Sequence, residues 1–286
     1  MFGLKSGRHE GLTIIKPDGG ICSQIGFVAL GEMIRRYGGT VKYDLAWYRE
    51  KGTDDLDLFV RNWDFEKAFP GVKIEMASQD EIDYLKRHRP YRRGTSYDFD
   101  KASFYMQGPS RERHVALAAM MPSLRGEFHP FLDDASRGML ARIESGRSCA
   151  VHVRRGDLAN GNRAYGKPAS DEYFRRAILM AAALLPNSRF FFFSDEPDWV
   201  DDALLPKMPS GFEYIVVRGN GSDRGYVDLF LISRCDCSIS SAGTLGVFGA
   251  LLSEKEPVLF MNRRQDYALD NFKNIIVVKD DFASIS

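Results

Sequence analysis

The sequence has no charge bias and no long apolar run. Its 286 residues carry 39 Lys and Arg against 39 Asp and Glu, a formal net charge of zero. Such a chain has no bulk field that favours nucleic acid or an anionic membrane, so any recognition of phosphate has to be local. No apolar run reaches the roughly 18 residues of a membrane-spanning helix. Residues 1–10 lack the apolar core of a signal peptide.

Cysteine is scarce, and its spacing argues against two kinds of site. The four cysteines are Cys22, Cys149, Cys235 and Cys237. They do not form the spaced pairs of a zinc site or of a disulfide framework. We interpret them as buried thiols and expect a reducing compartment. The chain is therefore expected to be cytoplasmic, or peripheral at a membrane.

Common catalytic and nucleotide-binding fingerprints are also absent. The sequence contains no Gly-x-Gly-x-x-Gly and no Gly-x-Ser-x-Gly string. Without Gly-x-Gly-x-x-Gly the chain lacks the fingerprint of dinucleotide binding. Without Gly-x-Ser-x-Gly nothing in the sequence supports a generic hydrolase. The acidic run 54–57 could suggest a metal site, but a solvated helix start explains it better.

The first half opens with a β-α-β pattern. An apolar strand at 12–15 runs into a turn at 17–20, and Ser23 is a candidate N-cap for a helix through Tyr37. A second strand follows at 41–45. The basic stretch 86–93 is interpreted as a solvated loop, 103–107 as a strand and 130–144 as a helix. We expect a domain boundary after residue 146, which divides the chain into domains 1–146 and 147–286.

The second half alternates cleanly between strands and helices. Ser170 is the expected N-cap of a helix over 171–185. Strands are expected at 149–153, 189–193, 214–217, 236–239 and 258–261, and further helices at 227–233 and from about 245 to 252. Strands that alternate with helices predict an α/β fold with a parallel sheet and right-handed crossovers.

The most informative stretch is the end of the strand at 149–153. His152 lies on this strand, and Arg154, Arg155, Gly156 and Asp157 follow it directly. Ligands of open α/β sheets bind beyond the carboxyl ends of strands. The fork of donors on an arginine matches phosphate oxygens, and Asp157 can fix its direction. A surface salt-bridge cluster is the alternative, but His-x-Arg-Arg-x-Asp on a core strand favours an anion site.

A second candidate phosphate site is the small-residue stretch 240–244, which includes Gly243 and Thr244. Backbone N–H groups at the start of the following helix would face an anion, and Ser and Thr hydroxyls would add donors. Ordinary N-capping explains the stretch about as well when it is taken alone. Asp228, on the preceding helix, has the acceptor oxygens that guanine's paired donors need.

Three stretches resemble the α1,2-fucosyltransferases of glycosyltransferase family 11, which use GDP-fucose. Residues 150–158 resemble their first motif, and 228–235 resemble their Asp-x-x-Leu-x-x-x-Cys string. Residues 242–246 are similar to the Gly-Thr-Phe-Gly motif of the animal members, where bacterial members usually carry Asn-Ser-Ser-Phe-Ser-Trp. The loop at 19–24 resembles the family's glycine-rich loop and shares Gln24 with it.

The resemblance implies a GT-B type fold, with two Rossmann-like domains whose parallel sheets face a cleft. Domain 1–146 would bind the acceptor, a galactose-terminated glycan, and domain 147–286 would bind GDP-fucose. The implied reaction inverts the anomeric carbon and needs no metal or other cofactor. The balanced charge and the lack of a long apolar run lead us to expect no nucleic-acid partner and no membrane span.

The resemblance also implies a role for each candidate residue. Arg154 would neutralise charge on the leaving GDP, with support from His152, Arg155 and Asp157. Gly243 and Thr244 would bind phosphate, and Asp228 would bind guanine. Asp18, on the first loop, is a candidate catalytic residue, although a turn-forming role is the commoner explanation. We expect loss of Arg154 to reduce turnover without unfolding the chain.

Two alternatives stay open at this point. One is a fucosyltransferase of another linkage, such as an α1,6-type enzyme that shares the first motif. The other is a non-catalytic protein that binds a nucleotide or a sugar.

Overall fold

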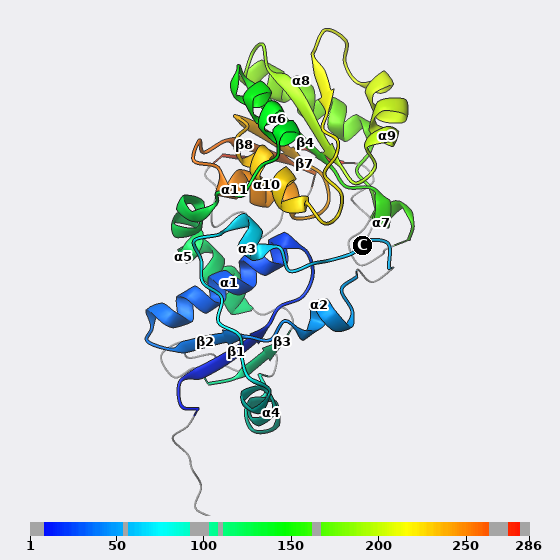
Figure 1. Ribbon diagram of the computed structural model, residues 1–286. Helices are drawn as coiled ribbons and strands as arrows, with labels where there is room; N and C mark the ends of the chain where they lie inside the picture. The colour runs from blue at the N-terminus through cyan, green and yellow to red at the C-terminus, as the bar shows by residue number, and fades with distance from the viewer. Residues whose placement is uncertain are drawn as a thin grey trace, which may run out of the picture. The chain divides into compact units, whose positions relative to one another are not determined.

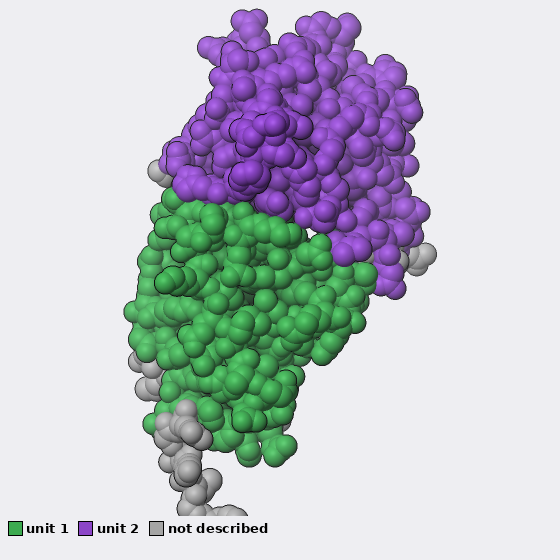
Figure 2. All heavy atoms as spheres, in the orientation of Figure 1, with its two compact units in different colours: residues 1–53, 61–127 green, residues 54–60, 128–286 purple. Residues whose placement is uncertain are grey.

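The computed structural model divides the chain into two compact units, which Figure 2 shows in different colours. Unit 1 comprises residues 1–53 and 61–127, and unit 2 comprises residues 54–60 and 128–286. The structure describes residues 9–53, 57–91, 103–107, 111–161, 167–262 and 274–280. No helix within these ranges is long and apolar enough to cross a membrane.

Unit 1 is built on a three-stranded parallel sheet in the order β2-β1-β3 (Figure 1). The strands are β1 (Leu12–Lys16), β2 (Thr40–Tyr43) and β3 (Tyr105–Gln107). The helices are α1 (Ile21–Arg36), α2 (Ala46–Glu50), α3 (Phe65–Ala68), α4 (Gln79–His88) and α5 (Arg111–Glu127). The predicted β-α-β opening is confirmed, because β1 and β2 pair in parallel and α1 connects them.

Two local predictions in unit 1 are wrong. Helix α1 begins at Ile21, two residues before the predicted cap, with Gly20 at its N-cap. The Ser23 hydroxyl does not cap the helix and bonds to the side chain of Asp18. Residues 86–88 form the last turn of α4, where basic side chains suit the negative end of the helix dipole. Residues 92–93 of the basic stretch and 54–56 of the acidic run lie outside the described residues.

Unit 2 is built on a six-stranded parallel sheet in the order β6-β5-β4-β7-β8-β9. The strands are β4 (Ser148–Val153), β5 (Arg189–Ser194), β6 (Tyr214–Val216), β7 (Cys237–Ser240), β8 (Val258–Met261) and β9 (Ile275–Val277). The helices are α6 (Asp134–Glu144), α7 (Gly156–Ala159), α8 (Asp171–Leu184), α9 (Pro197–Trp199), α10 (Gly225–Ser233) and α11 (Leu245–Leu252). A π-helical turn, Val200–Leu204, and a 3-10 turn, Leu205–Lys207, follow α9.

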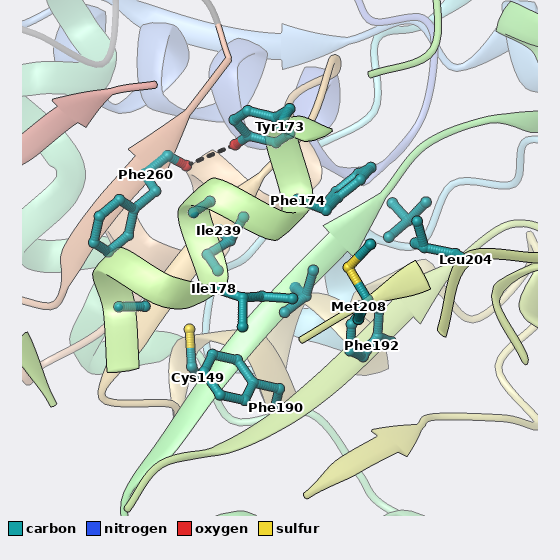
Figure 3. Packing of buried hydrophobic residues seen from close by; sticks show 14 of the residues in the cluster. Cys149, Tyr173, Phe174, Ile178, Phe190, Phe192, Leu204, Met208, Ile239 and Phe260 are labelled. Carbon is teal, nitrogen blue, oxygen red and sulfur yellow. Dashed lines mark hydrogen bonds between the residues drawn. The ribbon is translucent and has the colours of Figure 1, made fainter. Parts of the chain in front are cut away.

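Strand β4 is buried along its whole length because helices cover both faces of the sheet. On one face, Cys149, Val151 and Val153 pack with residues of α8, including Ile178 (Figure 3). On the other face, Ala150 packs with residues of α6 and α10. Side chains alternate along a strand, so His152 points to the same face as Ala150. The continuous apolar run in the sequence thus reflects a strand with two buried faces.

The cap that was predicted for α8 is confirmed. The Ser170 hydroxyl accepts the Tyr173 backbone N–H at 3.1 Å. The Tyr173 hydroxyl in turn donates to the Ser240 carbonyl at 2.7 Å, which ties α8 to the end of β7. The domain boundary that we expected after residue 146 stays a prediction.

Candidate active site

The two predicted phosphate-binding stretches lie side by side in unit 2, at the carboxyl ends of neighbouring strands. Strands β4 and β7 pair in parallel, with His152 opposite Ser240. One residue beyond β4, the Arg154 backbone N–H donates to Ser241 Oγ at 2.9 Å. The sheet therefore brings Arg154 against the stretch 240–244, as the strand-end argument anticipates.

The guanidinium of Arg154 is held by Asp157. Arg154 Nε donates to Asp157 Oδ1 at 3.0 Å, and Nη2 donates to Oδ2 at 2.6 Å. The Asp157 side chain is 1% exposed and the Arg154 side chain is 22% exposed. This bidentate geometry fixes the plane of the fork and leaves part of the arginine open to solvent.

Gly243 lies directly against Arg154. A Cβ atom at position 243 would come within 2.8 Å of Arg154 Cδ and 3.0 Å of Nη1, and the φ angle of Gly243 is +107°. Both the backbone conformation and the close approach require glycine here. The main chain at Gly243, just after β7, therefore packs directly against the Arg154 side chain.

His152 is buried and uncharged beside this arginine. It is 6% exposed, and its Nδ1 atom has no hydrogen-bond partner. Burial lowers its pKa to about 3, and the charge of Arg154 acts in the same direction. His152 approaches α11 closely, because a Cβ at Gly246 would lie 2.8 Å from the His152 Cβ. A neutral imidazole at this position can donate or accept a hydrogen bond but carries no charge.

The hydroxyls of the stretch 240–244 differ from the expected row of free donors. Ser241 Oγ accepts the Arg154 N–H, and Ser240 Oγ donates to the Ser241 carbonyl at 3.2 Å. Both serines are buried, whereas Thr244 is exposed. Thr244 is the N-cap residue of α11, and its side chain makes no capping hydrogen bond. Of the three hydroxyls, that of Thr244 is the one placed to meet a ligand.

Arg155 points toward the end of strand β5. Its Nε atom lies 2.9 Å from Glu196 Oε2, and its guanidinium carbon lies 4.2 Å from the centre of the Trp199 ring. The backbone N–H groups of Arg155 and Gly156 both donate to the carboxylate of Asp195, each at 3.0 Å. Asp195, Glu196 and Trp199 were not among the candidate residues predicted from the sequence. A signal was present, because Asp195 and Glu196 directly follow a core strand.

Asp228 lies on α10, which packs against α11. A Cβ at Gly249 of α11 would fall 2.3 Å from Ile232 Cγ2 on α10, so the two helices are in close contact. Asn220 Nδ2 donates to Asp228 Oδ1 at 2.7 Å. Burial raises the pKa of Asp228 to about 7, although the Asn220 hydrogen bond opposes the shift. The carboxyl is thus poised to exchange a proton near neutral pH.

Asp18 belongs to unit 1, where it follows β1. Its Oδ1 atom accepts from the Ser23 hydroxyl at 3.4 Å. The neighbouring Gln24 is fully buried, and its amide group bonds to the Gly19 carbonyl, the Asn62 carbonyl and the Asp64 N–H. Gln24 therefore clamps the first loop to the segment 61–64.

Among the described residues, no group of three or more His, Cys, Asp or Glu side chains is placed to hold a metal ion. The positive groups beside β4 belong to arginines. The backbone N–H groups of residues 154–156 already have protein acceptors, so an anion at the end of this strand would meet the guanidinium of Arg154.

Comparison with known proteins gives one family and several distant relatives. The profile of glycosyl transferase family 11 matches residues 56–276. The O-antigen biosynthesis glycosyltransferase WbnK of Escherichia coli is 26% identical over 131 residues, which are 45% of this chain and 42% of WbnK. The galactoside alpha-(1,2)-fucosyltransferase 1 of Saimiri boliviensis boliviensis is 27% identical over 151 residues, 49% of this chain and 40% of that protein. The matched region thus spans less than half the length of either relative.

A solved structure supports the fold. The ADP-heptose LPS heptosyltransferase II of Escherichia coli aligns with a TM-score of 0.50 at 10% identity, over 93% of this chain and 89% of that one. Together with the parallel sheets of the two units, this likeness confirms the expected α/β architecture of the GT-B type.

Proposed function

Because the chain belongs to glycosyl transferase family 11, we propose that it transfers L-fucose from GDP-β-L-fucose to a sugar hydroxyl, as an inverting galactoside α-1,2-fucosyltransferase. The fucosyltransferase relative carries this linkage in its name. The observation that carries the proposal is the Arg154 fork, held by Asp157 at the carboxyl end of the central strand.

The reaction is a single displacement at the anomeric carbon of fucose. The acceptor oxygen forms a bond to this carbon while the bond to the β-phosphate oxygen breaks, and the electron pair leaves with GDP. Negative charge therefore grows on the phosphate in the transition state. Arg154 neutralises that charge from a fixed position, which costs little reorganisation during the reaction.

The surrounding residues assist Arg154 in distinct ways. Asp157 sets the direction of the fork. Gly243 lets the main chain approach, and Thr244 offers an exposed hydroxyl at the positive end of α11. His152 supports the site as a neutral ring, so it adds a hydrogen bond to phosphate without adding charge.

Arg155 supports the same loop through its contacts with the end of β5. Asp228 accepts the N1–H and the exocyclic amine of guanine through its carboxylate. Its proton equilibrium near pH 7 then makes guanine binding sensitive to pH. The first half of the chain is the acceptor side, and Asp18, on its first loop, is the candidate catalytic residue there.

We propose that transfer needs no metal ion. The developing charge on a diphosphate leaving group can be met by positive side chains and backbone N–H groups instead. Arg154 and the start of α11 supply both kinds of group at the ends of adjacent strands.

The direct test is to incubate the purified protein with GDP-fucose and a panel of galactose-terminated acceptors. We expect release of GDP and a product with an α1,2 linkage. A product of another linkage, such as α1,6, would support fucosyltransferase activity but contradict the α1,2 linkage. Tight GDP binding without turnover on any acceptor would favour a non-catalytic nucleotide- or sugar-binding protein.

A further inference from the structure

The end of strand β5 holds the turn that carries Arg154. The two carboxylate oxygens of Asp195 accept the backbone N–H groups of Arg155 and Gly156, each at 3.0 Å. Just before it, Ser194 Oγ donates to the Val153 carbonyl at 2.8 Å. Hydrogen bonds to an ionised acceptor are roughly twice as strong as neutral ones. Residues at the end of a neighbouring strand thus hold the backbone of the motif, in addition to the contacts that its own side chains make.

These bonds act on a short helix that leads back to Arg154. Helix α7 has Arg155 at its N-cap, and Arg155 makes no side-chain capping bond. Asp195 supplies the missing cap from another strand. Helix α7 also carries Asp157, whose carboxylate grips the guanidinium of Arg154. A movement of α7 would therefore carry Asp157 with it and turn the arginine fork.

We infer that Asp195 is a positioning residue, which sets the direction of the Arg154 guanidinium through α7 and Asp157. The inference rests on the proposed function for the role it gives to Arg154. Asp195 itself touches no reacting atom. Its effect should therefore appear in the chemical step and not in the affinity for the nucleotide.

The first measurement is steady-state kinetics of Asp195→Asn. The amide turns one acceptor oxygen into an NH₂ group that faces a backbone N–H, so one of the two bonds is lost. Displacing a catalytic group by about 1 Å can cost on the order of 100-fold in rate. We expect kcat to fall by roughly 10- to 100-fold, while the Kd for GDP changes by less than about threefold.

Two further variants separate geometry from charge. Asp195→Glu keeps the charge but moves the oxygens, so we expect the same loss of kcat. Asp198→Asn is the matched control, because Asp198 lies on α9, is 85% exposed and pairs with Arg218. Its kcat should stay at the wild-type value. Near-native turnover of both Asp195 variants would overturn the inference.

The second measurement asks whether Asp195 acts through Arg154. In an Arg154→Lys background, Asp195→Asn should lower kcat by less than about threefold, because residues that act as a unit are not additive. A full additional loss would show that Asp195 acts independently. Thermal melts of each variant identify any that fails to fold.

The third measurement does not need turnover. A locked Arg154 should give a distinct Nε–H signal in a ¹⁵N spectrum, because that proton is hydrogen-bonded to Asp157. We expect Asp195→Asn to broaden or shift this signal while Asp198→Asn leaves it in place. An unchanged signal would overturn the inference even if the wild-type protein transferred no fucose. Conversely, if the wild-type protein transferred no fucose but Asp195→Asn still shifted the signal, the proposed function would be rejected and the inference about Asp195 would stand.

Discussion

Replacing Arg154 by alanine tests the candidate site most directly, because the structure predicts a loss of stability as well as a loss of turnover. The alanine variant leaves Asp157, which is 1% exposed, without both of its bonds to the guanidinium. Breaking a fully buried pair typically costs about 3–5 kcal/mol. Because the Arg154 side chain is itself 22% exposed, we expect about 2–3 kcal/mol. The expectation from sequence that the variant still folds stays a prediction, now with a measurable loss of stability attached to it.

The loss of turnover should be larger than this destabilisation can explain. Removing one fixed donor from a developing negative charge costs on the order of 100-fold in kcat. Arg154→Lys keeps the charge but loses the bidentate fork, so it should also lose about 100-fold or more. The Kd for GDP should change less than kcat, since the group acts mainly in the transition state.

A charge-balanced variant separates the two effects. In Arg154→Ala/Asp157→Asn the buried carboxylate is gone, so we expect it to regain at least about 1 kcal/mol of the lost stability. It should regain no turnover. Urea melts and steady-state assays of GDP release would measure both quantities. Recovery of turnover in the double variant, or near-native turnover of Arg154→Lys, would refute the role given to Arg154.

Three further predictions follow from the same site. Asp228→Ala should weaken GDP more than UDP, by about 1–3 kcal/mol in calorimetry. Because the pKa of Asp228 is raised to about 7, GDP should also bind more weakly at pH 6 than at pH 8, and Asp228→Asn should lose that dependence. The pKa of His152 is lowered to about 3, so the unfolded chain takes up a proton that the folded chain refuses. The free energy of unfolding should then fall by roughly 2 kcal/mol between pH 7 and pH 5, and this part of the fall should be absent in His152→Gln. GDP affinity should be unchanged by EDTA, and loss of most of the affinity would refute metal independence.

The sequence predicts those features that depend on neighbours along the chain. The run 149–153 marks a central strand because both faces of β4 are buried. Ser170 identifies the start of α8 because its hydroxyl reaches the N–H of a residue on the next turn. The pairing of Arg154 with Asp157 is likewise local, since only Arg155 and Gly156 separate them along the chain.

Features that depend on strand order are not readable in the same way. Asp195 lies far along the chain from the motif that it supports, and it comes close because β5 pairs with β4. The sequence also cannot show which partner a serine hydroxyl takes. Ser23 donates to the Asp18 side chain, and Ser241 accepts the Arg154 backbone N–H. Strand β9 was not predicted, because its three residues at the sheet edge are too short a pattern.

The segment 54–60 has a practical consequence for dividing the molecule. It belongs to unit 2, although the residues on either side of it belong to unit 1. The Phe59 ring atom Cζ lies 2.9 Å from the place where a Cβ of Gly156 would stand, so Phe59 packs against the start of α7. A truncated chain that starts at residue 128 would lose this contact with Gly156. A fragment meant to retain it would include residues 54–60, for example joined ahead of residue 128 by a linker.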